Sequence, residues 1–305
     1  MRYFLQRLKA AAVELKDYQK KAAATIQDYP TTKEMNEVIP FLGIVGEAGS
    51  VLTELKKKIR DGKFYNGFHE RLTEELGDVL WYVAAIATRY DLTLEDVASR
   101  NLEKVLDRFS DEAVEFKNYD EQYPTKEQFP KEFQVVFDPF EEGGQKKMRI
   151  YSFEDGEDVG DPLTDNTYIE DGYRYHDVFH YGYVAYLGWS PVVRRLFERK
   201  RRSEPLVDEN EDGARATIIE EMISLYIFER AKYHNLLKYS DSVDTEILKT
   251  VQHFASSIEI KDCSARQWEE AILNSYKVYN DLVENDGGRI MVSLKNRKLI
   301  YIGKN

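Results

Sequence analysis

Two acidic patterns inside apolar segments constrain the fold of this chain more than any other feature. Glu47 and Glu54 lie seven residues apart, and Glu75 and Asp78 are i,i+3 neighbours. At about 100° per residue, each pair projects from one face of a helix. A buried carboxylate is costly unless a cation or a hydrogen-bond donor compensates it. The two patterns therefore predict two helices whose acidic faces converge on a metal ion.

The type of ligand narrows the choice of ion. Oxygen ligands suit Mg²⁺ or Mn²⁺, which keep several waters and contact substrate phosphates. The alternative is that these acids are the solvated charges of ordinary amphipathic helices. The neighbouring run from Val79 to Ala87 is almost entirely apolar and should be buried, which favours the metal site.

Three ordered motifs within about residues 10–110 point to a family. They are Gly46-Glu47-Ala48-Gly49 with Glu54-Leu55-Lys56-Lys57, then Glu75-Leu76-Gly77-Asp78-Val79-Leu80-Trp81-Tyr82, and finally Asn101-Leu102-Glu103-Lys104. This order resembles the MazG group of all-α nucleoside triphosphate pyrophosphohydrolases and is more specific than any single acidic pair. The resemblance implies Mg²⁺-dependent attack of water on an NTP or dNTP, giving the monophosphate and pyrophosphate.

The resemblance also implies that Glu47, Glu75 and Asp78 bind the metal. The family's first motif usually has a Glu three residues after its first Glu, and this chain has Ser50 at that position. Ser50 thus occupies the place of a missing metal ligand. Glu54, one turn further on, is expected to reach the ion directly or through a water molecule.

Hydrolysis also needs a base for the attacking water. A carboxylate that is not fully used as a metal ligand can accept the proton of that water, which makes Glu54 and Glu74 the candidates. With the metal ligand Glu47, they complete the predicted catalytic set.

Most candidate nucleotide ligands lie on the fourth predicted helix. The resemblance favours Asn101 and Lys104 for nucleotide contacts, and Arg108 follows on the same helix. Lys57 lies just beyond the acids and is a further candidate. The pair Trp81-Tyr82 either lines a base pocket or packs in the core.

Ser50 keeps a second class of function open. In this alternative, the first domain senses a nucleotide or mediates dimerisation with weak or no hydrolysis, and the second domain has the effector role. Metal-dependent release of pyrophosphate distinguishes the two hypotheses.

Charge and cysteine content narrow the partners and the compartment. The net charge of −12 argues against a nucleic-acid or anionic-membrane surface, because polyphosphate binding needs concentrated positive charge. The single cysteine, Cys263, excludes an intrachain disulfide and a Cys-based zinc site, and a reducing cytoplasm is the simple inference. The first twenty residues match neither a signal peptide nor a spanning helix. The expectation is a cytoplasmic protein that binds no nucleic acid or membrane.

Residues 1–115 predict an all-α helical bundle. The first expected helix spans residues 5–28. The second runs from a Thr31/Glu34 capping box to about residue 60, with a bend or a new start at Pro40. The third spans about 69–90, and the fourth runs from Thr93 to about residue 109. Four helices with short connections form a bundle. Its core is small, so a homodimer or higher homo-oligomer is expected to bury the apolar run at 79–87.

The rest of the chain predicts a linker over 116–132 and an α+β domain over 133–305. Strands are expected at 133–137, 148–153, 289–294 and 299–302, with turns at 141–144 and around Lys295-Asn296. These strands are too few for a barrel, so a small antiparallel sheet with helices is expected. The predicted fold class is mainly α, with an NTP pyrophosphatase-like bundle followed by this α+β domain.

A second polar constellation lies in the α+β domain. His176 and His180 are spaced i,i+4 with Asp177 between them, and Glu220 and Glu221 follow about forty residues later in an apolar helix. Such a set can bind a metal or a phosphate. The alternative is a hydrogen-bonded core network in which an acid satisfies each histidine.

The two halves also share an order of features. In each, a polar-bearing helix precedes a basic stretch, a loop and a Glu-Glu helix. This order suggests a diverged duplication of the helical bundle.

Overall fold

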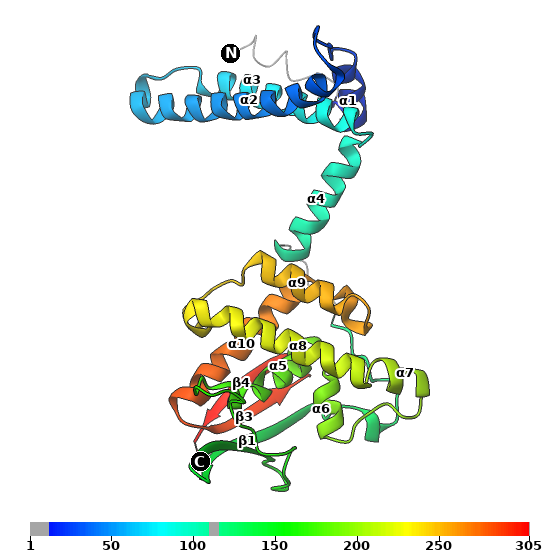
Figure 1. Cartoon of the computed structure of the whole chain (residues 1–305), viewed down its shortest axis with the longest axis vertical. Helices are drawn as coiled ribbons and strands as arrows, with labels where there is room; N and C mark the ends of the chain where they lie inside the picture. Colours follow the sequence, from blue (N-terminus) through cyan, green and yellow to red (C-terminus); the bar gives the residue numbers. More distant parts are fainter. Residues whose placement is uncertain (1–11, 110–115, 305) are drawn as a thin grey trace. The chain divides into compact units, whose positions relative to one another are not determined.

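The chain forms two compact units in a computed structural model that describes residues 12–109 and 116–304 (Figure 1). The units are Met1–Leu106 and Asp107–Asn305. The structure is mainly helical with one four-stranded antiparallel sheet, which confirms the predicted fold class.

The first unit consists of helices alone. They are α1 (Leu15–Ala23), α2 (Lys33–Asp61), the short 3₁₀ segment η2 (Gly62–Phe64), α3 (Phe68–Arg89) and α4 (Leu94–Phe109), the last of which runs into the second unit. Helices α2 and α3 lie side by side, and α1 packs on α3 (Figure 1). The expected C-terminal stop of α2 is confirmed by Gly62, which has a positive φ of 54°. The expected cap of α4 is confirmed by the Thr93 hydroxyl, which accepts the backbone N–H of Asp96 at 3.1 Å.

Two predicted helix boundaries were wrong. The first helix covers only Leu15–Ala23 of the expected 5–28, and residues 5–11 of that prediction lie outside the described residues. The second helix is capped by Thr32, whose hydroxyl accepts the N–H of Met35, and not by Thr31. Pro40 lies inside this helix, so it does not begin it.

The core of the first unit is small. Its fully buried cluster comprises Leu94 and a few alanines on α1 and α3. From the apolar run at 79–87, only Ala84, Ala85 and Ala87 are fully buried in the single chain, and burial of the rest of the run by oligomerisation stays a prediction. Helix α4 likewise leaves apolar side chains exposed, including Leu102 and Leu106.

The second unit is built around one sheet. Its strands are β1 (Glu132–Glu142), β2 (Gln145–Ser152), β3 (Gly288–Ser293) and β4 (Lys298–Gly303), paired in the order β2-β1-β3-β4. Both predicted hairpins are confirmed, and Gly143 and Gly144 take the positive φ values that the β1–β2 turn requires.

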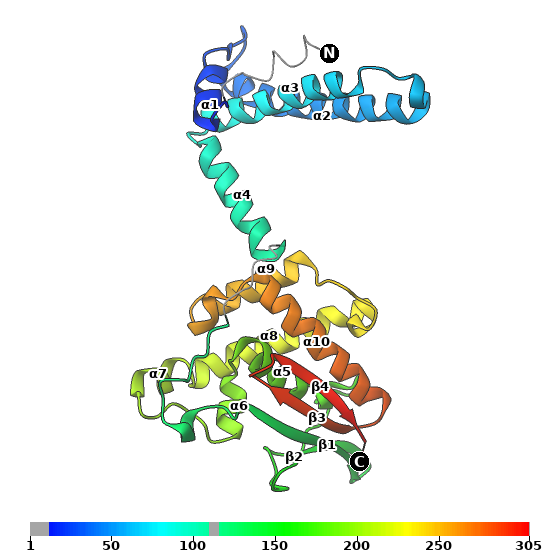
Figure 2. The same cartoon turned by 180° about the vertical axis from the view of Figure 1, so that it is seen from behind.

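Helices cover the sheet and supply most of the core. They are α5 (Asp177–Leu187), α6 (Pro191–Leu196), α7 (Pro205–Asn210), α8 (Ala214–Ala231), α9 (Thr245–Ala255) and α10 (Ala265–Glu284), with 3₁₀ segments η3 (Thr125–Glu127), η4 (Tyr173–Tyr175), η5 (Lys232–Leu237) and η6 (Glu259–Asp262). Helices α5 and α10 pack on each other and on β4, and α8 packs on α5, α6 and α9 (Figure 2). The two buried tryptophans, Trp189 and Trp268, belong to this core.

Residues 116–132 are part of the second unit and do not form a separate linker. Asp120 and Phe129 are buried there, and the Asp120 carboxylate accepts the backbone N–H of Phe129 at 2.8 Å and the Arg194 guanidinium at 3.0 Å. The unit boundary lies inside α4, earlier than the predicted end of the first domain at residue 115.

The suspected duplication stays a prediction. Helices α2 and α3 are joined only by residues 62–67, whereas α5 and α8 are separated by α6 and α7. The second unit also contains a sheet, and the described part of the first unit contains helices alone.

A buried ionic network makes the second unit sensitive to the loss of a single charge. Arg201 is 1% exposed, and its guanidinium donates to Asp212, to Glu259 at 2.8 Å and to the Tyr119 carbonyl at 3.0 Å. The variant Arg201→Ala leaves these carboxylates without their buried cation, so we expect it to lower the free energy of unfolding by about 3–5 kcal/mol. Urea unfolding measures this loss. Lys146→Ala, which breaks an exposed pair, is the control and should change it by less than about 1 kcal/mol; equal effects would contradict the prediction.

Candidate functional site

A close contact between α2 and α3 positions the acidic residues of the first unit. The Tyr82 ring of α3 lies directly over Gly43 of α2, where a Cβ would come within 2.1 Å of the ring. Only glycine permits this approach of the two helices. Glu47 lies one turn beyond Gly43 on the same face of α2 and therefore points toward α3.

Three of the predicted metal ligands meet at this contact. One carboxylate oxygen each from Glu47, Glu75 and Asp78 lies within 4.8 Å of the others. None of the three forms an ion pair with another side chain in residues 12–109 or 116–304. Three unpaired negative charges at this separation repel one another, so a divalent cation with a preference for oxygen fits the donor set.

The other predicted residues around the acids lie differently. Glu54 is buried, but its two oxygens accept bonds from Lys57 at 2.5 Å and from the Tyr65 hydroxyl. The hydrogen bond from Lys57, followed by that from Tyr65, lowers the pKa of Glu54. The structure therefore joins Glu54 to Lys57 and not to the three-acid group. Ser50 lies half-buried on α2, and Glu74 is exposed on α3.

Two of the predicted nucleotide ligands, Asn101 and Lys104, are exposed on α4. The prediction for Arg108 is corrected, because its guanidinium belongs to the second unit, where it pairs with Glu269 at 2.9 Å and donates to the Val243 carbonyl at 2.7 Å. Lys57 is held by Glu54, as described above.

A small pocket between elements of the first unit shares Tyr82 with the contact that positions the acidic group. It has a volume of about 100 Å³, and Trp81, Tyr82 and Arg89 are among its lining residues. The Trp81 indole N–H donates to the Thr25 hydroxyl at 2.8 Å. Burial, and then the nearby Glu47, raises the pKa of Tyr82, so this ring connects the pocket to the acids.

Sequence reasoning missed Arg89. Its Nη2 donates to Asp28 at 2.9 Å, while its Nε is buried in the pocket wall without a partner in the described structure. The available signal was a single cation two residues after the apolar run at 79–87.

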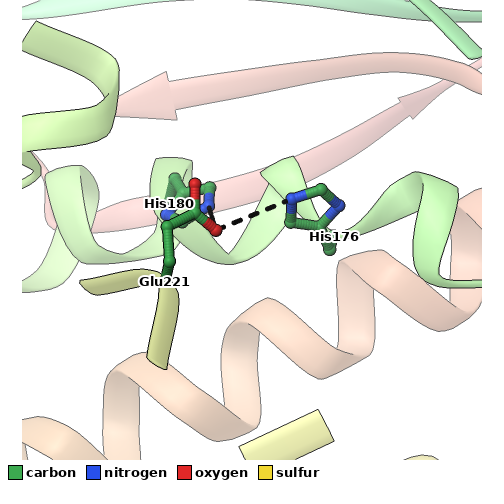
Figure 3. A group of neighbouring side chains, drawn as sticks. All are labelled: His176, His180 and Glu221. Carbon is green, nitrogen blue, oxygen red and sulfur yellow. Dashed lines mark ion pairs between the residues drawn. The ribbon is translucent and has the colours of Figure 1, made fainter. Parts of the chain in front are cut away.

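The second predicted constellation also comes together, at the start of α5. Figure 3 shows the Glu221 carboxylate, from α8, facing both imidazole rings. Glu221 Oε2 lies 3.9 Å from His176 Nε2 and 3.6 Å from His180 Nε2. His176 and His180 are 7% and 0% exposed.

The other two acids of this constellation, Glu220 and Asp177, contact the histidines in different ways. Glu220 is fully buried, and it accepts His180 Nδ1 at 2.8 Å, the Ser190 hydroxyl at 2.6 Å and the Val192 N–H at 2.8 Å. This part matches the predicted core network. Asp177 lies beside His176, with its Oδ1 3.3 Å from Nε2.

For both imidazole rings, burial lowers the pKa and the neighbouring carboxylates raise it, and the net result differs. Burial lowers the pKa of His176. Burial also opposes protonation of His180, but the adjacent Glu220 and Glu221 outweigh it and raise the pKa of His180 well above its usual value.

Comparison with known proteins covers both units. Residues 114–305 match the family profile of the MazG C-terminal domain, and residues 41–111 match that of the MazG nucleotide pyrophosphohydrolase domain. The "Gene 37 protein" of Mycobacterium phage L5 is 44% identical over 69 residues, which are 22% of this chain and 60% of that protein. This chain thus spans less than two thirds of that relative's length. No solved structure matches the chain.

Proposed function

This chain belongs to the MazG family, and we propose that it is a Mg²⁺-dependent pyrophosphohydrolase that converts an NTP or dNTP to the monophosphate and pyrophosphate. The observation that carries this proposal is the convergence of Glu47, Glu75 and Asp78, three unpaired carboxylates within 4.8 Å of one another. All three lie within the part of the chain that matches the nucleotide pyrophosphohydrolase domain.

These three residues are the ones that would hold the metal. A bound Mg²⁺ or Mn²⁺ would neutralise phosphate charge and lower the pKa of the attacking water. Around it, the chain has to supply a proton acceptor and contacts to the nucleotide.

Glu74 is the better candidate for the proton acceptor. Glu54 already accepts hydrogen bonds from Lys57 and Tyr65, which makes its carboxylate a weaker base. Glu74 is exposed on α3 beside the metal ligand Glu75. In the reaction, water forms a bond to phosphorus, its proton passes to Glu74, and the bond between the α- and β-phosphates breaks to release pyrophosphate.

The nucleotide contacts are assigned by exposure and by family position. Asn101 and Lys104 on α4 are exposed and are proposed to contact the nucleotide. Trp81 and Tyr82, with Arg89, line the small pocket and are proposed to contact the base.

Pyrophosphate release from a panel of NTPs and dNTPs tests the proposal. Release should require Mg²⁺ or Mn²⁺ and should stop when EDTA is added. Absence of release from every nucleotide, in the presence of either metal, would contradict it.

Ser50 supports a second candidate, a nucleotide-sensing module with weak or no hydrolysis. At this position, the family usually supplies one more carboxylate, so the metal would be held by fewer charges here. Tight binding of a non-hydrolysable nucleotide analogue, together with absent pyrophosphate release, would favour this candidate.

The variant Ser50→Glu is expected to tighten Mg²⁺ binding by about tenfold, because it adds a carboxylate one helical turn from Glu47. Activity should be retained. Isothermal titration with Mg²⁺ or Mn²⁺ measures the affinity. Ala48→Glu is the control, since Ala48 is an exposed residue two positions before Ser50 and projects from another side of α2, so the added charge should leave the affinity unchanged. An unchanged affinity of the Ser50→Glu variant would mean that residue 50 does not face the ion.

A homodimer or higher homo-oligomer is proposed because α2 exposes an apolar face. Its exposed side chains recur every three to seven residues along the helix, at Val38, Leu42, Val45, Leu52 and Ile59. The segment Lys33–Phe64 is also long and apolar enough to cross a membrane when judged by length and composition alone. However, a membrane-spanning position would place Glu47 and Glu54 in the bilayer, which is costly. A second copy of the chain is therefore the favoured partner of this face.

A further inference from the structure

We propose that the side chains of His176, His180 and Glu221 form a binding site for a divalent transition-metal ion such as Zn²⁺. This site is separate from the acidic group of the first unit. The three donor atoms lie within 4.8 Å of one another. This site goes beyond the proposed pyrophosphohydrolase, and its argument does not depend on that function.

The hydrogen bonds of the two rings determine which nitrogens are free. His176 Nδ1 lies 2.8 Å from the Tyr173 carbonyl, which can only accept, so Nδ1 carries the hydrogen. His180 Nδ1 lies 2.8 Å from the Glu220 carboxylate, which also accepts. In both neutral rings, the lone pair is therefore on Nε2.

Both Nε2 atoms face the same carboxylate oxygen. Glu221 Oε2 is 3.6 Å from one Nε2 and 3.9 Å from the other. His180 Nε2 is buried and has no hydrogen-bond partner in the described structure. Lone pairs that converge on an anionic oxygen repel one another unless a cation or a proton lies between them. The metal site and a proton held by His180 are thus the two possible resolutions.

The surroundings favour a metal. Metal-bound histidines usually donate their second ring N–H to a carboxylate or a backbone carbonyl, and both arrangements are present here. Glu220 is itself fixed by Ser190 and by the Val192 N–H. The His176 ring is held by stacking on Tyr173, with the ring centroids 4.2 Å apart. The two rings are therefore held in place before any ion binds.

The donor set selects the class of ion. Two imidazole nitrogens with one carboxylate suit Zn²⁺ and its neighbours in the first transition row, whereas Mg²⁺ prefers oxygen ligands. Zinc–nitrogen bonds are about 2.0–2.1 Å long, so the three donor atoms, which lie within 4.8 Å of one another, have to move closer together when the ion binds. Three protein ligands leave a coordination position for water or for Asp177, whose Oδ1 is 3.3 Å from His176 Nε2. A bound ion would connect the start of α5 to α8.

Zinc binding by the untagged, metal-free full chain tests this site. The titration uses Zn²⁺ alone, with excess Mg²⁺ present to occupy the acidic group, and elemental analysis gives the stoichiometry. One Zn²⁺ per chain is expected to remain bound. In a second titration with Co²⁺, visible absorption bands should report nitrogen ligation.

Glu221→Gln is the decisive variant, because the Glu221 side chain is 40% exposed and its replacement should not disturb folding. We expect it to weaken Zn²⁺ binding by at least about tenfold. His176→Gln removes a second ligand and should have the same effect. Glu229→Gln, on the same helix but paired with Lys232, is the matched control and should bind as the wild type does.

Two results would overturn the metal site. The first is absence of Zn²⁺ uptake in excess Mg²⁺, and the second is equal affinity of the wild type and the Glu221→Gln variant. The first would show that a proton, and not a metal, joins these side chains, and the second would show that Glu221 does not bind the ion. Pyrophosphate release by Glu221→Gln should equal that of the wild type, so failure of this inference and failure of the proposed function can be distinguished.

Discussion

The variants Asp78→Asn and Glu75→Gln are each expected to lower pyrophosphate release at least about 100-fold while leaving the helix content unchanged. Each replaces a charged oxygen ligand in a group of three carboxylates that lie within 4.8 Å of one another. Metal binding weakens as a result. The same change relieves repulsion between like charges, so the melting temperature without metal should hold or rise.

Turnover at saturating Mg²⁺ and thermal unfolding followed by circular dichroism check these two expectations. Glu70→Gln is the matched control, because Glu70 is an exposed acid on α3 outside the group. It should keep wild-type activity. Near wild-type turnover of either test variant would show that the metal site is assigned to the wrong residues. Zinc binding by Asp78→Asn should be unaffected, since the two proposed sites share no residue.

Local spacing predicted the acidic group because its residues are close in sequence or belong to two strongly patterned helices. Glu75 and Asp78 share a face of α3 because they are i,i+3 neighbours in a helix. Glu47 was assigned as a metal ligand through the order of the family's motifs. The contact that brings Glu47 to α3 depends on Gly43 beneath Tyr82. Glycine within a helix has many causes, so the sequence alone did not indicate this contact.

The wrong assignments share a different cause. Arg108 was named as a nucleotide ligand because it follows Asn101 and Lys104 on the same predicted helix, but its partners Val243 and Glu269 are more than a hundred residues away. The dipeptides Tyr123-Pro124 and Phe129-Pro130 are typical of linkers, yet Phe129 itself and the nearby Asp120 are buried in the second unit. Periodicity and turn signals report local preference and do not reveal such long-range partners.

The start of α2 was predicted wrongly because neighbouring residues give competing helix-start signals. Thr31 and Thr32 are both good caps, and the choice of Thr32 depends on which hydroxyl reaches the free N–H of the first turn. Pro40 favours the start of a helix, but here the stronger cap lies earlier, and the helix continues through the proline. The residue types therefore allowed two starts for α2, at Thr31 and at Pro40, and neither is the observed cap.

The double variant Val45→Asp/Leu52→Asp is expected to convert an oligomeric chain to monomers. Val45 and Leu52 are 70% and 64% exposed on α2, seven residues apart on the face opposite Glu47. A charge placed at the centre of an apolar interface has to be desolvated on association, which costs several kcal/mol and is repeated in each copy. The first unit has few buried apolar residues of its own, so the exposed face of α2 is the surface it most needs to cover.

Light scattering coupled to size-exclusion chromatography gives the mass of each variant in solution, and circular dichroism verifies that α2 remains helical. Ile169→Asp is the control, because Ile169 is equally apolar and 79% exposed but lies in the second unit. It should keep the wild-type mass. A monomeric wild type, or a double variant with unchanged mass, would contradict the proposed interface. Vesicle binding that the wild type shows and the double variant loses would instead assign the α2 face to a membrane, despite the carboxylates on the opposite side of that helix.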